Sequence, residues 1–341
     1  MATNYAGAVR AGSQAAARLH QQLRTRDRMA DTGGGVDVFG ASLDLQLPLL
    51  LRPLKGLLGA YLPTPTPGVL VTTQRPLSIQ RFTAAHELGH FRLDHLPSLD
   101  DENMLRRMAL PNAPPELSGP NMQEAEADAF ATAFLMPRWL IDWHCRRQGW
   151  NARSFTHPFF VYQLSLRMGA SYEATTWTLQ RQNIITSSTG SLLRQTAPRA
   201  IKVELLRDYT PANFKGDVWH LTERDGGTRI DGSRNDHFVL NLNEHSGGGY
   251  VWDIDQLRAS GFAVMRDDRE ATDPEGVGNN TVRSVIGAPD EPHRGLLSLA
   301  ETRPWIPDEP ISELTFDYDF TGPEEEGLSR AERRQILEAA A

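Results

Sequence analysis

The sequence is poor in cysteine, and this limits how the chain can be held together. Cys145 is the single cysteine among 341 residues, so no disulfide can form within the chain. A chain without internal disulfides is typical of a reducing compartment. We therefore expect a cytoplasmic protein in which Cys145 is a buried or half-buried residue without a chemical role.

Long apolar runs are also missing. The segment Met1–His20 lacks the continuous apolar core of a signal peptide, and the run Leu43–Leu51 is interrupted by Pro48. That run is far shorter than the roughly 20 residues that a membrane-spanning helix needs. The sequence predicts no membrane partner.

Positive charge is in deficit as well. There are 35 Lys and Arg residues against 43 Asp and Glu, which gives a net charge of -8. This balance argues against tight non-specific binding of nucleic acid by the whole molecule, although a local basic face remains open. The length predicts two or three domains with ample core.

The most specific pattern in the chain is His86-Glu87-Leu88-Gly89-His90. Residues four apart lie on the same face of a helix, so His86 and His90 can direct two imidazoles at one metal ion. Glu87 then lies close enough to accept a proton from an attacking water. Two surface histidines on an amphipathic helix would be the plain alternative.

A third ligand is predicted downstream. Glu124 and Asp128 lie four apart in a strongly helical stretch that ends near Pro137. Glu124 can complete a His-His-Glu set and leave one position open, while Asp128 can accept the outer N–H of a ligating histidine. Glu126 is the competing ligand, and a solvated acidic face is the plain alternative.

Several segments together resemble the ImmA/IrrE family of metallopeptidases. The resemblance covers residues 36–185, and Asp128 is a departure because many members carry Asn there. The segments that carry it are Val36–Gly40, Gly56–Leu62, Gln80–His90 and Glu124–Pro137. It implies an α+β, zincin-like peptidase whose usual substrates are helix-turn-helix repressors.

The predicted chemistry is hydrolysis of a peptide bond, with Glu87 as the general base and His86, His90 and Glu124 as metal ligands. Zinc is the default ion, although two His and one Glu also accept manganese or iron. Tyr61 and His95 are weak candidates for a donor to the oxyanion, and His95 can equally cap the end of the motif helix.

A helix-turn-helix pattern follows within residues 146–190. A helix beginning near Phe159 ends at Gly169, Ser171 can cap a second helix that extends to Arg181, and residues 186–200 read as a linker. Because Arg181 is almost the only positive charge of the second helix, packing or docking to a partner is favoured over DNA reading.

Residues 200–322 are predicted to form an all-β, immunoglobulin-like sandwich. Seven apolar runs with turn signals between them are the expected strands. These runs are Ile201–Leu206, Asp217–Leu221, His237–Leu242, Tyr250–Trp252, Phe262–Met265, Thr281–Ile286 and Leu314–Phe320.

Loops in this region resemble those with which the chagasin family binds papain-type cysteine peptidases. The first loop keeps Asn243, Gly249, Tyr250 and Trp252 but lacks the family's Pro-Thr-Thr core. A second loop carries Arg303, Pro304 and Trp305. The resemblance implies a site for a substrate, a regulatory protein or the peptidase's own cleft, with inhibition of a cysteine peptidase in doubt.

The predicted organisation is a peptidase domain at 1–145, the helical subdomain at 146–190, the sandwich at 200–322 and a helical tail at 323–341. Ser329 to Glu332 resembles a capping box at the start of that tail. The predicted function is cleavage of a repressor in a stress, mobile-element or phage-defence response. The rival hypothesis is a binding protein with a degenerate peptidase core that contacts DNA or a protein.

Overall fold

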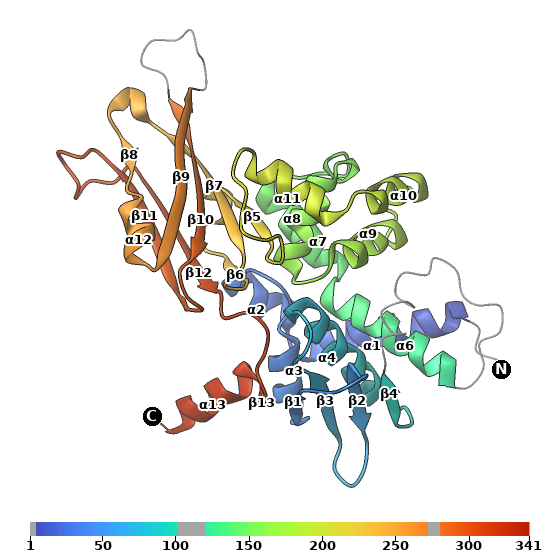
Figure 1. The fold of residues 1–341 in the computed structure, drawn as a ribbon. Coiled ribbons are helices and arrows are strands. Elements are labelled where there is room, and N and C mark those ends of the chain that lie inside the picture. Colours follow the sequence, from blue (N-terminus) through green and yellow to red (C-terminus); the bar gives the residue numbers. More distant parts are fainter. Residues whose placement is uncertain (1–4, 101–119, 272–279, 341) are drawn as a thin grey trace.

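The computed structural model describes residues 5–100, 120–271 and 280–340. Figure 1 shows a lower layer of helices on a small sheet, a group of helices above it, and a long β region to one side. Within these residues, no helix combines the length and the apolar character that crossing a bilayer requires.

The lower sheet has five strands in the order β13-β1-β3-β2-β4. Its strands are β1 (Leu49–Arg52), β2 (Gly59–Leu62), β3 (Gly68–Thr72), β4 (Ser98–Asp100) and β13 (Gly327–Leu328). β1 runs parallel to β3, and β2 pairs antiparallel with β3. β2 and β3 form a hairpin, and its prolines are confined to the connecting loop because proline cannot donate to a ladder.

In the described part of the chain, α3 (Val38–Asp44) and α4 (Leu77–Arg92) contact this sheet, α1 (Tyr5–Gln22) and α6 (Pro120–Leu135) pack against α4, and α2 (Thr25–Thr32) follows α1. α4 is the central one, since every residue from Gln80 to His90 is buried. α1 lies against α6 at Gly12, where an added Cβ would fall 2.1 Å from the Glu126 carbonyl oxygen. This close approach fixes α6, which carries the predicted acidic ligands, against its neighbours.

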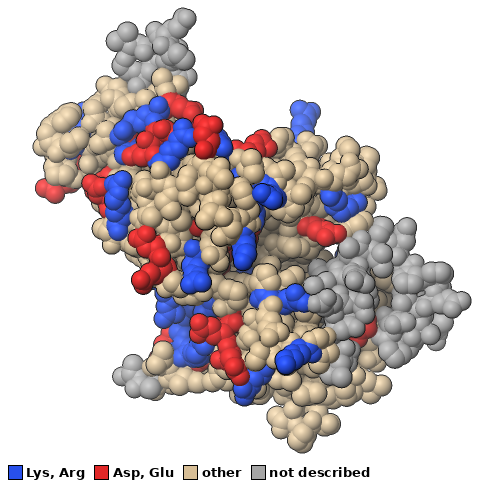
Figure 2. Space-filling view, viewed as in Figure 1, with Lys and Arg blue, Asp and Glu red and all other residues tan. Residues whose placement is uncertain are grey.

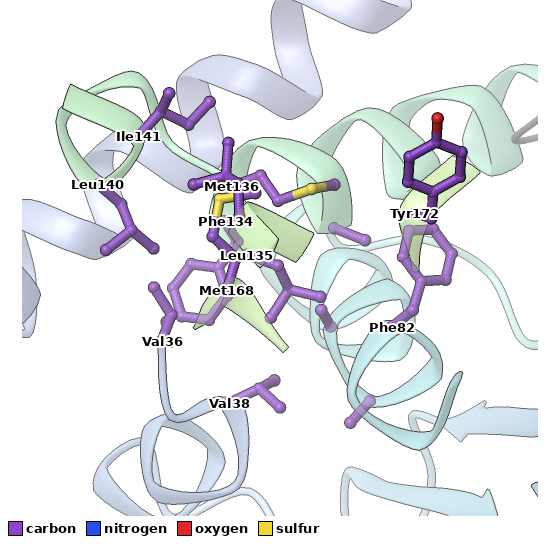
Figure 3. Close-up of a cluster of buried hydrophobic side chains, with 14 of the residues drawn as sticks. Val36, Val38, Phe82, Phe134, Leu135, Met136, Leu140, Ile141, Met168 and Tyr172 are labelled. Atoms are coloured by element: carbon purple, nitrogen blue, oxygen red, sulfur yellow. The ribbon is translucent and has the colours of Figure 1, made fainter. Parts of the chain in front are cut away.

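The second group of helices comprises α7 (Arg138–Gln148), α8 (Pro158–Met168), α9 (Tyr172–Arg181), α10 (Ser187–Gln195) and α11 (Pro198–Leu206). The predicted helix, glycine turn and second helix are present, with Gly169 at φ 63° and the Ser171 side chain capping α9. α7 runs through the predicted boundary at 145, and one hydrophobic core continues across it. Figure 3 shows that core, in which Val36, Phe82 and Phe134 lie near Met168 and Tyr172.

Two predictions in this region are wrong. Residues 186–200 are not a linker and Ile201–Leu206 is not a strand, because both segments are helical. Thr186 caps α10 by accepting from the Thr189 N–H, and Pro198 occupies the first turn of α11, where a missing N–H costs nothing. The buried residues Ile201, Leu205 and Leu206 follow helical spacing.

The C-terminal region is all-β and contains two four-stranded sheets, ordered β5-β7-β10-β9 and β6-β12-β11-β8. The strands are β5 (Val218–Leu221), β6 (Arg229–Asp231), β7 (His237–Glu244), β8 (Val251–Trp252), β9 (Phe262–Ala271), β10 (Thr281–Pro289), β11 (Arg294–Thr302) and β12 (Ser312–Asp319). A second core lies in this region and includes Trp252, Phe262 and Phe320. Strands β6 and β11 were not predicted.

Two sets of contacts fasten this β region to the helices. The side-chain amide of Gln163 on α8 bonds the β5 main chain in the way that a neighbouring strand would. It donates to the Val218 carbonyl at 2.9 Å and accepts from the His220 N–H at 2.8 Å. Arg167, also from α8, forms a buried ion pair with Asp225 at 2.8 Å.

The second set is made by residues 324–340, which return to the lower sheet. β13 pairs with β1, and the buried Gln80 side chain bonds both the N–H (2.7 Å) and the carbonyl (3.1 Å) of Glu324. The final helix, α13 (Arg330–Ala340), then begins at a capping box in which Ser329 and Glu332 bond each other's main-chain N–H. The predicted capping box is confirmed.

Candidate metal centre

The predicted histidine pair lies on the buried face of α4. His86 and His90 are one turn apart, and their Nε2 atoms are separated by 3.0 Å. Both rings have no exposed surface. Buried polar rings need polar partners, so this arrangement is costly unless it serves a site.

α6 brings a carboxylate to the same point. One Glu124 oxygen lies 3.4 Å from His86 Nε2, and the other lies 3.6 Å from His90 Nε2. Gly89 makes the approach of the two helices possible, because a Cβ there would lie 3.1 Å from the Phe130 side chain and 3.2 Å from the Ala127 Cα. The three residues predicted as metal ligands, His86, His90 and Glu124, therefore lie together in the structure.

The donor set fits a divalent ion. The three ligand atoms lie within 4.8 Å of one another, and ligands about 2.1 Å from a tetrahedral zinc ion would be about 3.4 Å apart. Two neutral imidazoles and one carboxylate are donors that zinc accepts, with one position left over. These residues form the one group of three or more His, Cys, Asp or Glu side chains with metal-ligand spacing in the described part of the chain.

Each histidine has a polar partner on the side away from the donor set. His86 Nδ1 lies 2.9 Å from an oxygen of Asp128, the residue that the sequence analysis named as a partner for a ligating histidine. His90 Nδ1 lies 2.9 Å from His95 Nδ1, and His95 Nε2 lies 2.8 Å from a Glu126 oxygen. Glu126 therefore contacts His95 and lies outside the donor set, unlike the alternative in which it was the third ligand.

The two weak candidates for an oxyanion donor occupy other positions. The His95 ring stands behind His90, and its main-chain N–H bonds the His90 carbonyl at 3.0 Å, which closes the end of α4. The Tyr61 ring is buried and packs edge-on against Phe91, with 6.2 Å between ring centroids. Burial raises the pKa of the Tyr61 hydroxyl, with a further contribution from Asp94.

Glu87 lies next to strand β2. Its side chain is buried, and a Cβ added to Gly59 would fall 2.6 Å from a Glu87 carboxylate oxygen. The β2 backbone therefore passes directly over the carboxylate, which only glycine permits. Gly59 was not among the predicted site residues, although an isolated glycine in a strand is a signal of close backbone approach.

The C-terminal loops named from the sequence also meet. The Arg303 guanidinium lies over the Tyr250 ring at 4.5 Å, and its Nε donates to the Gly248 carbonyl at 3.1 Å. Gly249 abuts the Trp305 ring, since a Cβ there would lie 2.6 Å from it.

The remaining loop residues divide into anchors and an exposed tip. The Asn243 carbonyl accepts from the buried Trp252 indole at 2.8 Å, whereas Pro304 is exposed and Trp305 is 67% exposed. In Figure 1 these loops lie at the end of the β region that faces away from strands β1 to β4.

The second helix of the helix-turn-helix pattern, α9, has little free surface. Every α9 residue from Thr175 to Leu179 is buried, and Thr178 contacts the Met136 sulfur at 3.6 Å. In Figure 2 the coloured Lys and Arg side chains are interspersed with Asp and Glu and form no continuous basic face in that view. This geometry agrees with the packing role that the sequence favours.

Comparison with known proteins adds a family for one part of the chain. Residues 48–178 match the Peptidase_M78 family model, described as the IrrE N-terminal-like domain. This range includes the donor set and its partners. A comparison with curated proteins finds no match.

Three solved structures show weak likeness. The cysteine protease inhibitor EhICP2 from Entamoeba histolytica is 25% identical, with 30% of this chain and 96% of that chain covered and a TM-score of 0.27. Amebosin is 20% identical, with 30% and 97% covered and a TM-score of 0.26. PbICP-C, in its complex with falcipain-2, is 11% identical, with 32% and 95% covered and a TM-score of 0.22.

Proposed function

Because residues 48–178 form an IrrE N-terminal-like domain, we propose that the protein is a metal-dependent endopeptidase, with zinc as the default ion and manganese as an alternative. The convergence of His86, His90 and Glu124 beside the buried Glu87 carries this proposal. A degenerate peptidase core would have no reason to keep three donor atoms within 4.8 Å.

His86, His90 and Glu124 are the residues that would hold the ion. When bound, such an ion polarises a carbonyl and lowers the pKa of water toward about 7. Asp128 would orient His86 by accepting its Nδ1 proton across 2.9 Å. Glu87 would accept a proton from the attacking water at a carboxylate oxygen and deliver it to the leaving amine.

We propose an intracellular helix-turn-helix repressor as the substrate, in a stress, mobile-element or phage-defence response. The proposal rests on the ImmA/IrrE resemblance of residues 36–185 and on the family match within them. We also propose that residues 1–145 act as the peptidase domain, 146–190 as a docking subdomain, 200–322 as a recognition or regulatory domain and 323–341 as a tail.

The exposed Trp305 and the Arg303–Tyr250 pair favour a protein partner at the C-terminal loops. Aromatic side chains with a nearby arginine are typical of binding hot spots. Because these loops face away from β1 to β4 in Figure 1, a separate protein suits them better than the peptidase's own cleft.

The first test separates chemistry from metal binding. A Glu87→Gln variant should retain one equivalent of metal and cut at least about 100-fold more slowly, because it loses the general base but none of the ligands. Metal content is measured by mass spectrometry of the purified protein, and cleavage by gel analysis of purified helix-turn-helix repressors offered as substrates. Chelation should stop cleavage by the wild type, and zinc or manganese should restore it.

Other outcomes point to other functions. Unchanged cutting by Glu87→Gln would refute the mechanism. A wild-type protein that binds no metal and cuts nothing would favour the rival hypothesis, a regulatory protein that binds DNA or a protein partner.

A further inference from the structure

A buried chain of hydrogen bonds runs from α6 to the back of His90. His95 lies between them, 2.9 Å from His90 through its Nδ1 and 2.8 Å from Glu126 through its Nε2. Its ring is almost completely buried and meets the His90 ring edge-on at 4.9 Å between centroids. Neither His95 nor Glu126 is needed to complete the donor set of His86, His90 and Glu124.

Local backbone geometry places His95 at this point. α4 ends at Arg92, and Asp94 adopts the left-handed conformation with φ 56°. The turn lets the His95 N–H bond the His90 carbonyl. A non-glycine residue at positive φ carries a cost of about 1 kcal/mol or more, and here it redirects the chain so that the His95 ring stands behind His90.

The partners determine which nitrogen of His90 is available. A carboxylate only accepts, so His95 Nε2 carries a proton toward Glu126. A neutral His95 then has a lone pair at Nδ1, which can accept from the His90 Nδ1–H. His90 in turn presents the lone pair of Nε2, the atom that lies 3.0 Å from His86 Nε2.

The two histidines are therefore supported in different ways. His86 contacts a carboxylate directly through Asp128, whereas His90 reaches Glu126 only through an imidazole. Glu126 is two residues from both Glu124 and Asp128, so it projects from a different side of α6. Helix α6 thus supplies the proposed ligand Glu124, the His86 partner Asp128, and Glu126, which bonds His95 behind His90.

We propose that His95 and Glu126 are positioning residues that hold His90 in the tautomer and orientation needed for metal binding. This inference rests on the proposed function, since it assigns a role toward the same ion. Partners of this kind typically change metal affinity by about 10- to 100-fold.

The test uses two matched pairs of variants and measures metal affinity rather than cleavage. His95→Asn keeps an acceptor near the position of Nδ1, while His95→Leu has the same shape without it. Glu126→Gln keeps an acceptor for His95 Nε2, and Glu126→Met does not. Zinc affinity is measured by competition with a chromophoric chelator, and the visible absorption of the cobalt-loaded protein reports the ligand geometry.

We expect His95→Leu and Glu126→Met to bind zinc about 10- to 100-fold more weakly than wild type, with an altered cobalt spectrum. His95→Asn and Glu126→Gln should recover most of the affinity and the wild-type spectrum. Thermal unfolding of each metal-free variant checks that it folds, and affinities are compared between members of a folded pair.

The inference is overturned if His95→Leu binds zinc as tightly as wild type. It is also overturned if His95→Asn and His95→Leu are equally impaired, since shape alone would then explain the effect. Failure of the wild type to bind metal would instead refute the proposed function itself, so the two failures are distinguishable.

Discussion

At the scale of single residues, Gly59 offers a direct probe of the proposed general base. A Cβ at this position would lie 2.5 Å from the Thr83 Cγ2 and 2.6 Å from the Glu87 carboxylate. Gly59→Ala should therefore move Glu87 and lower the rate of cleavage by about 100-fold or more, the usual contribution of a general base. Metal content should remain unchanged, because no ligand is touched.

Gly68 provides the matched control on the same hairpin. A Cβ there meets a single neighbour, the Pro48 carbonyl oxygen at 3.6 Å, which is ordinary van der Waals contact. Gly68→Ala should cut at the wild-type rate. Equal activity of Gly59→Ala and wild type would show that Glu87 tolerates displacement and is not the base.

Residue-scale prediction from the sequence reached only part of the centre. His86 and His90 are related by the helical period, and the same period pairs Glu124 with Asp128, so local sequence contains both relations. The contacts of His95 with Glu126 and of Gly59 with Glu87 join different elements. These two contacts depend on the turn at Asp94 and on the packing of β2 against α4. No local sequence pattern predicts either feature.

At the scale of elements, strongly periodic helices and turn-bounded strands were predicted well. The failures have physical reasons. Ile201, Val203 and Leu205 alternate as a strand would, but Pro198 starts a helix and the buried residues follow the 3.6-residue period instead. β11 was not predicted: its first three residues are all exposed, with Leu296 62% accessible, so this part lacks the alternation of a half-buried strand.

Gln80 makes a buried contact between elements for which we expect a clear effect on stability. Its side chain satisfies the Glu324 N–H and carbonyl and also donates to the Thr72 carbonyl at 3.2 Å, all in a buried setting. Gln80→Leu should lower the free energy of unfolding by about 1–3 kcal/mol, because buried main-chain groups lose their partners. Chemical denaturation measures this change.

Hydrogen exchange gives a local readout for the same variant. The amides of residues 324–328 should lose protection in Gln80→Leu. The exposed Gln195→Leu on α10 serves as the control, with a change below about 0.5 kcal/mol. Full protection of residues 324–328 in Gln80→Leu would contradict a clamping role.

At the scale of the whole molecule, buried histidines make stability depend on pH. Burial lowers the pKa of His20 and of His220 to about 4 and that of His144 to about 3. The unfolded chain takes up these protons near the usual pKa of about 6.5. The free energy of unfolding is therefore highest above about pH 6.5, and it falls as the pH drops from about 6.5 to 4, because only the unfolded chain takes up these protons in that range.

One acid opposes this trend. Burial raises the pKa of Asp236 to about 6. The unfolded chain therefore loses this proton at a lower pH than the folded protein, so Asp236 lowers the free energy of unfolding as the pH rises from about 4 to 6. The three histidines outweigh it, and we expect net destabilisation on acidification.

His20→Leu should reduce the loss of stability between pH 7 and pH 4 by about 3 kcal/mol, because burial lowers the pKa of His20 to about 4 from about 6.5 in the unfolded chain. The exposed His157→Gln is the control. The measurement is the free energy of unfolding by urea at several pH values, and equal slopes for His20→Leu and wild type would disprove it.

The return of the tail has a consequence for how the chain is made. Leu50 of β1 pairs with Leu328, and Gln80 bonds Glu324, which lies 244 residues further along the sequence. At about 5–20 residues per second, a ribosome takes roughly 10 to 50 seconds to cover that distance. The lower sheet of the nascent chain therefore remains without β13 until the β region has been synthesised, so translation products that end before residue 327 cannot complete this sheet.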